Sequence, residues 1–179
     1  MPFGDVEDPT GSVTPTRRDE DMSVFAFREV FDHASNLPLA EDLQVRIPTP
    51  AGFCALKMSA WVNRSVTGEL RDGPDIAAAV HWYAESKIIQ NRLYGTDEGT
   101  EVLISAEMDV RLASAEVLGL DLAREIGPDR VGELGARWSE SIRRQLTREF
   151  GHETIPDWPA DPSRRAAVID ALCSGIGIR

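Results

Sequence analysis

The chain has 179 residues, of which 42% are hydrophobic and 27% charged, so it is long enough to form one domain with a hydrophobic core. Its formal net charge of −11 at pH 7 argues against broad, non-specific nucleic-acid binding, although a bound nucleotide needs only local positive charge. Two cysteines and three scattered histidines provide neither a disulfide framework nor a metal-ligand motif. No run approaches the roughly 20 apolar residues of a membrane span, and no signal peptide is recognisable, so we expect a cytoplasmic protein.

The front of the chain predicts a little β structure and one short helix. Apolar residues near helical spacing predict a helix from about Phe27. Two short strands around a turn at residues 40–42 are expected, because Leu43, Val45 and Ile47 alternate with polar residues as in a half-buried strand. The prolines that follow end this strand and begin the next helix.

A mostly apolar segment comes next, and one lysine stands within it. From Phe53 to Val62 only Lys57 and Ser59 are polar, so we expect a helix that is buried on nearly every side. A lysine in such a helix must extend its amine to solvent, pair with an acid or hold an anion. Arg64 comes two turns after Lys57 and nearly on the same helix face.

The following helix is expected to open at Asp72. With Asp72 as N-cap, Asp75 falls at position N3, so two carboxylates face the amide-rich end of one helix. In a purely structural interpretation Asp72 caps the helix, Asp75 completes a start like a capping box, and Lys57 pairs with one of the two acids. A functional interpretation of the same residues depends on the resemblance described below.

The middle of the chain is expected to be helical apart from its loops. The second helix is predicted to continue through residues 85–92, with a loop over 91–99 and a helical stripe over 102–118. A short helix over residues 120–126 is predicted to end at Gly127, because glycine is the preferred residue after a helix.

The clearest amphipathic pattern predicts one helix over residues 128–150. Its apolar face carries Val131, Leu134, Trp138, Ile142 and Leu146. The arginines on its polar side are expected to form a solvated surface rather than a phosphate site. After a loop over 151–162, Ser163 is expected to cap a last helix. The predicted fold class is therefore α+β, mostly α, with short N-terminal strands followed by a helical bundle.

Four segments carry a resemblance to a known family. They are Pro2-Phe3-Gly4 with Glu7-Asp8-Pro9, the run Met22–Glu29, the run Ala55–Arg64 around Lys57, and Arg71-Asp72-Gly73-Pro74-Asp75. In this order and spacing they resemble the nucleotidyltransferases of the AbiEii/AbiGii toxin type, a branch of the polymerase-β-like superfamily. In such proteins a buried helix with Lys and a downstream Arg precedes a helix opened by a basic residue, Asp, two residues and Asp. The resemblance covers residues 1–83 by motif and the helical remainder by general pattern.

The resemblance implies two-metal chemistry, in which carboxylates hold divalent ions that activate the attacking hydroxyl and bind the leaving triphosphate. Those carboxylates belong to an Asp-x-Asp strand after Gly-Ser and to a strand ahead of Pro-Phe-Gly. Here no Asp-x-Asp follows Gly11-Ser12, and no Gly-Ser precedes the acids Glu107 and Asp109. We therefore expect no catalytic and no metal-binding residue in this chain, and Mg²⁺ only in a complete catalytic domain. On this interpretation Met1 is an internal methionine or the gene is truncated.

The roles that the resemblance implies fall on four residues. Lys57 and Arg64 face the triphosphate of an NTP, as cations near a phosphate site should, and Asp72 and Asp75 orient the lysine or reach the metal shell. The expected function is that of the C-terminal portion of a nucleotidyltransferase with an unknown acceptor, inactive as an isolated chain.

The resemblance also implies a division of the chain. The predicted parts are a remnant of a nucleotidyltransferase α/β domain over residues 1–48, a helical domain over 49–150, and a C-terminal loop and short helix over 151–179.

The alternative is a non-catalytic helical module that binds a protein partner, in a toxin–antitoxin or regulatory setting. The acidic surface and the predicted helix over 128–150 suit such a partner. Because residues 1–47 would lack the sheet that covers them, we also expect a homodimer or a poorly ordered N-terminus up to about Met22. Nucleotide affinity that depends on Lys57 distinguishes the first function from the second. An unrelated hydrolase is disfavoured, because the chain has no Gly-x-Ser-x-Gly and no P-loop.

Overall fold

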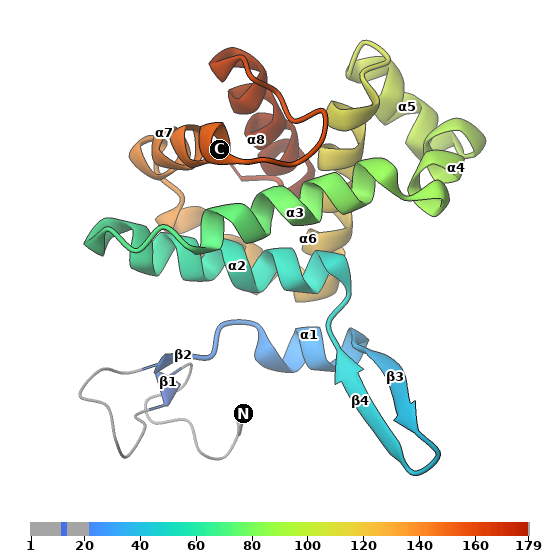
Figure 1. The fold of residues 1–179 in the computed structure, drawn as a ribbon, viewed down its shortest axis with the longest axis vertical. Helices are drawn as coiled ribbons and strands as arrows, with labels where there is room; N and C mark the ends of the chain where they lie inside the picture. The colour runs from blue at the N-terminus through green and yellow to red at the C-terminus, as the bar shows by residue number, and fades with distance from the viewer. Residues whose placement is uncertain (1–11, 14–21, 179) are drawn as a thin grey trace.

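The computed structural model describes residues 12–13 and 22–178, and Figure 1 shows their arrangement. The fold is α+β and mostly α, as the sequence predicts. The strands are β1 (Ser12–Val13), β2 (Met22–Ser23), β3 (Ser35–Ala40) and β4 (Leu43–Ile47). The helices are α1 (Phe27–His33), α2 (Pro50–Arg64), α3 (Asp72–Glu85), α4 (Lys87–Gly95), α5 (Asp97–Ser105), α6 (Val110–Arg137), α7 (Glu140–Glu149) and α8 (Pro162–Ile176), with 3-10 turns η1 (Ser65–Thr67) and η2 (Phe150–His152).

The β3–β4 hairpin confirms the predicted pair of strands and its turn. The strands are antiparallel, with Leu37 opposite Val45, and they extend away from the helices beyond α1 (Figure 1). Because side chains alternate along a strand, Leu43 and Ile47 lie on the same face as this pair. The four side chains, which we call the apolar hairpin face, are 40–54% exposed. Every residue of β3 and β4 is exposed, so the expectation that β4 is a half-buried strand is wrong.

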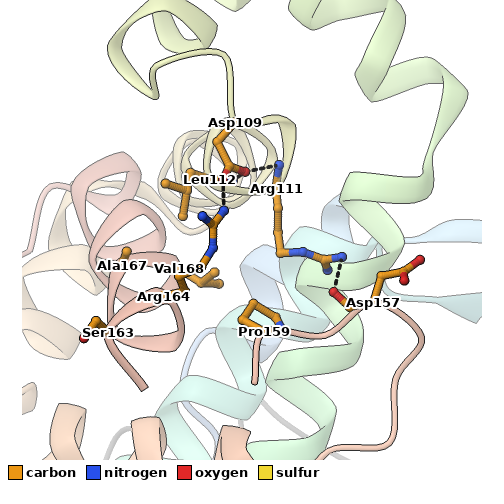
Figure 2. A pocket seen from close by; sticks show the side chains of 9 residues that line it. All are labelled: Asp109, Arg111, Leu112, Asp157, Pro159, Ser163, Arg164, Ala167 and Val168. Carbon is orange, nitrogen blue, oxygen red and sulfur yellow. Dashed lines mark hydrogen bonds and ion pairs between the residues drawn. The ribbon is translucent and has the colours of Figure 1, made fainter. Parts of the chain in front are cut away.

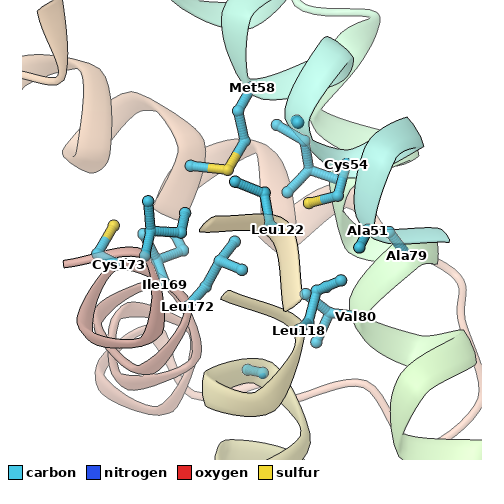
Figure 3. Close-up of a cluster of buried hydrophobic side chains, with 14 of the residues drawn as sticks. Ala51, Cys54, Met58, Ala79, Val80, Leu118, Leu122, Ile169, Leu172 and Cys173 are labelled. Atoms are coloured by element: carbon cyan, nitrogen blue, oxygen red, sulfur yellow. The ribbon is translucent and has the colours of Figure 1, made fainter. Parts of the chain in front are cut away.

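The hydrophobic core lies where α2, α3, α6 and α8 meet. Figure 3 shows Met58 and Cys54 of α2 directed toward Leu118 and Leu122 of α6, with Leu172 of α8 beside them. Cys54 has no exposed surface and packs as a small core residue. The core extends from residue 25 to residue 178, so it joins residues on both sides of positions 48 and 150. The predicted division into three parts stays a prediction.

Helices α6 and α8 touch backbone to backbone. A Cβ atom at Gly119 of α6 would overlap the carbonyl oxygen of Leu172, and one at Gly175 of α8 would overlap that of Glu116. Glycine at these two positions therefore lets the helices approach more closely than any other residue would allow.

Two predictions about the segment over residues 85–99 are wrong. Ser86 has extended dihedral angles and ends α3, so α4 is a separate helix. The stretch that was predicted as a loop contains the end of α4 and the start of α5, where Thr96 accepts a hydrogen bond from the Gly99 N–H. Gly99 packs against the carbonyl of Arg92, where a Cβ would overlap. The glycine in this segment therefore serves the close packing of α5 on α4 rather than a loop.

The predicted break at Gly127 is confirmed, since this residue has φ 77° in the middle of α6. The segment before it is one helix from Val110 rather than two. The predicted helix over 128–150 is wrong in its length, because it breaks at Trp138 and Ser139 caps α7. Asp161, and not Ser163, caps α8 by accepting two backbone hydrogen bonds.

Candidate functional site

The four residues singled out from the sequence form one cluster between α2 and α3. Lys57 Nζ lies 2.6 Å from Asp75 Oδ2 and 3.4 Å from Asp72 Oδ1. Arg64 Nη1 lies 3.0 Å from Asp72 Oδ2 and 3.2 Å from Asp72 Oδ1. We call these four residues the Lys57 cluster. The structure pairs each cation with an acid, which is what the structural interpretation of the sequence expects.

Asp72 does not cap α3, and that prediction is wrong. It occupies the first helical position, Arg71 stands at the N-cap, and no side chain caps this end. The Asp72 side chain has no exposed surface and accepts hydrogen bonds from Lys57 and Arg64 instead. The turn η1 returns the chain after α2, so the start of α3 lies beside the two cations. A buried carboxylate must be neutralised, and two cations do so more effectively than backbone amides.

The two cations keep part of their surface in solvent. The Lys57 side chain is 29% exposed and that of Arg64 is 40% exposed. In the described part of the chain the hydrogen bonds from Arg64 to carboxylates use Nη1, which leaves Nε and Nη2 for another acceptor. Asp72 therefore contacts both cations on their buried side, and both cations keep part of their surface in solvent.

Further carboxylates lie beyond the Asp75 end of the Lys57 cluster. Burial raises the pKa of Glu153, and the negative charges of Glu149 and Asp75 raise it further, while His152 lowers it. A Cβ at Gly73 would lie 3.2 Å from Glu149 Cβ, so the end of α7 packs closely against the start of α3. An anion would therefore meet the least repulsion at Lys57 and Arg64, away from the Asp75 end.

An aromatic pair lies beside Lys57, and the sequence interpretation missed it. The rings of Phe53 and Trp82 have their centroids 5.8 Å apart, and Lys57 Nζ lies 5.5 Å from the Phe53 centroid. Trp82 is 50% exposed. The signal was present in the spacing, because Phe53 stands one turn before Lys57 and Trp82 two turns after Asp75.

The described residues do not fit the Mg²⁺ site that the resemblance implies for a complete catalytic domain. They contain no group of three or more His, Cys, Asp or Glu side chains placed to hold a metal ion. Asp72 and Asp75 are both engaged by cations. Of the acids Glu107 and Asp109, the second caps α6 and pairs with Arg164. The segments Pro2-Phe3-Gly4 and Glu7-Asp8-Pro9 lie outside the described residues.

A cavity of about 330 Å³ lies between the starts of α6 and α8 (Figure 2). Asp109 pairs with Arg164 there, and Arg111 Nη2 donates to the carbonyl of Asp157 at 3.0 Å. The backbone amides at both helix starts already donate to Asp109 and Asp161. Both helix ends and the Asp109 carboxylate are thus satisfied internally, whereas Arg111 Nη1 is buried without a hydrogen-bond partner among the described residues. None of the residues of the Lys57 cluster lines this cavity, so the sequence-based candidates do not point to it.

Comparison of the chain with protein-family models, with curated proteins and with solved structures gives no match. Among the helices of the described residues, none combines the length and the apolar character needed to cross a membrane.

Proposed function

We propose that this chain is the C-terminal, phosphate-contacting portion of a nucleotidyltransferase, and that Lys57 and Arg64 contact the triphosphate of an NTP. One observation supports the proposal: the Lys57 cluster brings together the two cations that the resemblance assigns to the triphosphate and the two acids that it assigns to their support. Asp72 holds both cations from the buried side, which limits the side-chain entropy that they lose when they bind an anion. The proposed location is the cytoplasm, where NTPs are available.

The charges of the cluster set the expected affinity. Two cations are paired with two carboxylates, so a phosphate must compete with Asp75 for Lys57. At Arg64 the phosphate would accept hydrogen bonds from Nε and Nη2, because Nη1 is bound to Asp72. We expect weak binding of the magnesium complex of tripolyphosphate, with Kd on the order of 1 mM. The carboxylates that would perform transfer are not assigned to any residue of this chain, so turnover is expected only from a complete protein.

Titration calorimetry with magnesium tripolyphosphate tests the proposal. Lys57→Met removes the charge and keeps an apolar stem, so we expect it to lower the affinity at least tenfold. The matched control is Lys87→Met, which neutralises the other lysine of the chain at an exposed position of α4. Equal affinities of the wild type and Lys57→Met would sink the proposal, provided that circular dichroism shows both to be folded.

Protein binding is a second candidate function, and the apolar hairpin face favours it. Among the described residues β3 and β4 pair only with each other, so both outer edges of this sheet are open. A two-stranded sheet with one exposed apolar face gains stability from further strands. An identical copy can supply them through a symmetric contact, as in the homodimer that the sequence interpretation expects. The alternative expectation, a poorly ordered N-terminus up to about Met22, falls mostly on residues outside the described ones.

Light scattering over a range of concentrations tests this second function. We expect a dimer that Val45→Lys converts to a monomer, because a charge would be buried at the centre of the contact. Ile88→Lys, at a position of α4 that is 79% exposed, is the control and should leave the mass unchanged. A wild-type chain that stays monomeric at every concentration would count against the homodimer.

A further inference from the structure

We propose that Phe53 and Trp82 form the surface on which the base of a nucleotide stacks, next to the Lys57 cluster. This inference rests on the proposed contact of Lys57 with phosphate and adds the part of the ligand that the aromatic pair recognises. The ligand class is thus a nucleoside triphosphate rather than any polyphosphate.

The position of the pair relative to Lys57 supports this assignment. Phe53 is close to both Trp82 and Lys57: its ring centroid lies 5.8 Å from that of Trp82 and 5.5 Å from Lys57 Nζ. An aromatic surface and a cation are therefore neighbours on the α2–α3 surface. A nucleotide carries the same two features, a planar base and an anionic chain, joined through a sugar.

Trp82 differs from two other tryptophans of the chain in its exposure. The indole is half exposed, while Trp61 of α2 and Trp138 are buried, so this large apolar surface is left in water. Its contact with Phe53 orients the ring, with 41° between the two ring planes. A base that stacks on Trp82 would remove this surface from water at little cost in side-chain order.

Stacking on a single aromatic platform discriminates little between bases, because every base has a π-face. We expect purine nucleotides to bind somewhat more tightly than pyrimidine nucleotides, since they offer a larger ring area. Specificity for one base would require hydrogen-bond partners at the edge of that base, whereas Phe53 and Trp82 offer only the faces of their aromatic rings.

Three ligands separate the base from the phosphates in one titration series. We expect the magnesium complex of ATP to bind about tenfold more tightly than that of tripolyphosphate, and adenosine to bind weakly. Trp82→Ala should reduce the affinity for ATP to that for tripolyphosphate, whereas Trp82→Phe should retain most of the difference. ATP should also quench tryptophan fluorescence in the wild type and not in Trp82→Phe.

Tyr94→Ala removes another exposed aromatic residue, from α4, and serves as the control that should change neither affinity. If tripolyphosphate binds but ATP binds no more tightly, the stacking surface is refuted and the phosphate contact stands. If Trp82→Ala leaves the preference for ATP unchanged, the base stacks elsewhere and this assignment is refuted. If neither tripolyphosphate nor ATP binds, both proposals fail.

Discussion

Two ion-pair clusters in this molecule pair cations with carboxylates, and they differ in exposure and in the number of helices that they join. The Arg92 cluster comprises Arg92, Glu98, Asp121 and Arg124, from α4, α5 and α6. Arg92 donates to Asp121 at 2.7 Å and to Glu98 at 2.7 Å, and Tyr83 of α3 adds a bond to Asp121 at 3.3 Å. Burial and the Asp121 charge raise the pKa of Tyr83, so this phenol stays a hydrogen-bond donor. This cluster ties four helices together.

The Lys57 cluster joins only α2 and α3, which are consecutive and already packed through the core. Its acid Asp72 is fully buried, while the outer side of Arg64 remains exposed. Arg92 is 23% exposed and contacts two acids with both terminal nitrogens. A guanidinium with both terminal nitrogens paired to acids holds helices together, whereas one with a terminal nitrogen unpaired to an acid can still bind a ligand.

The largest expected effect on stability is that of Asp121→Asn. The change leaves Arg92 half-paired in a partly buried site and weakens the bond from Tyr83, so we expect a loss of about 2–3 kcal/mol in the free energy of unfolding. Asp129→Asn, an exposed position of the same helix, should change it by less than about 0.5 kcal/mol. Urea unfolding measures both, and coinciding midpoints of the two variants would show that the Arg92 cluster does not tie the helices.

The corresponding substitution in the Lys57 cluster is Asp72→Asn. Lys57 keeps its ion pair with Asp75, and the partly exposed Arg64 can be solvated by water. We therefore expect a smaller loss in the free energy of unfolding, of about 1–2 kcal/mol. The substitution removes one negative charge beside the cations and leaves an amide oxygen that can still accept their hydrogen bonds, so magnesium tripolyphosphate should bind several times more tightly than to the wild type. Asp121→Asn should leave this affinity unchanged. Titration calorimetry measures the affinity of both variants for magnesium tripolyphosphate. An affinity of Asp72→Asn equal to that of the wild type would mean that Lys57 and Arg64 do not bind the anion.

The smallest expected effect is that of Glu98 on the pH dependence of stability. Hydrogen bonds from Arg124 and then Arg92 lower the pKa of Glu98 from 4.5 to about 2. A lowered acid pKa stabilises the fold above pH 4.5, and this contribution is lost as the pH falls from 4.5 toward 2. Because Glu98 is 41% exposed, solvent screening keeps the contribution below about 1 kcal/mol.

Glu98→Gln should therefore flatten the stability curve in this pH range. Glu101→Gln, an exposed position on the same helix, should reproduce the wild-type curve. Melting temperatures between pH 2 and 6 provide the measurement, and parallel curves for wild type and Glu98→Gln would contradict the assigned role.

The elements that follow from local patterns were predictable from the sequence. The alternation of Leu43, Val45 and Ile47 predicts β4, and the prolines around Thr49 predict the start of α2. The helix boundaries at Ser86 and Trp138 were not predictable, because helical periodicity continues across them and tertiary contacts decide where the chain turns.

The candidate site was predictable as a set of residues and only partly as a geometry. Sequence spacing places Lys57 and Arg64 on one helix face and Asp72 near the start of the next helix. It cannot show that Asp72 is buried beneath both cations, since this depends on how η1 folds back. Trp82 was missed because an aromatic residue in an apolar helix is expected in the core, and exposure is a property of the assembled fold.

The contact between Gly119 and Gly175 has a consequence for how this chain can change in length. A residue inserted into α8 ahead of Gly175 would rotate the remainder of the helix by about 100° and replace the glycine at the contact by a side chain. An insertion in the segment between α7 and α8 leaves the packing of α8 on α6 unchanged, because that segment lies outside the contact between the two helices. Length variation in this fold is therefore confined to its connections, and the register of α8 on α6 is fixed.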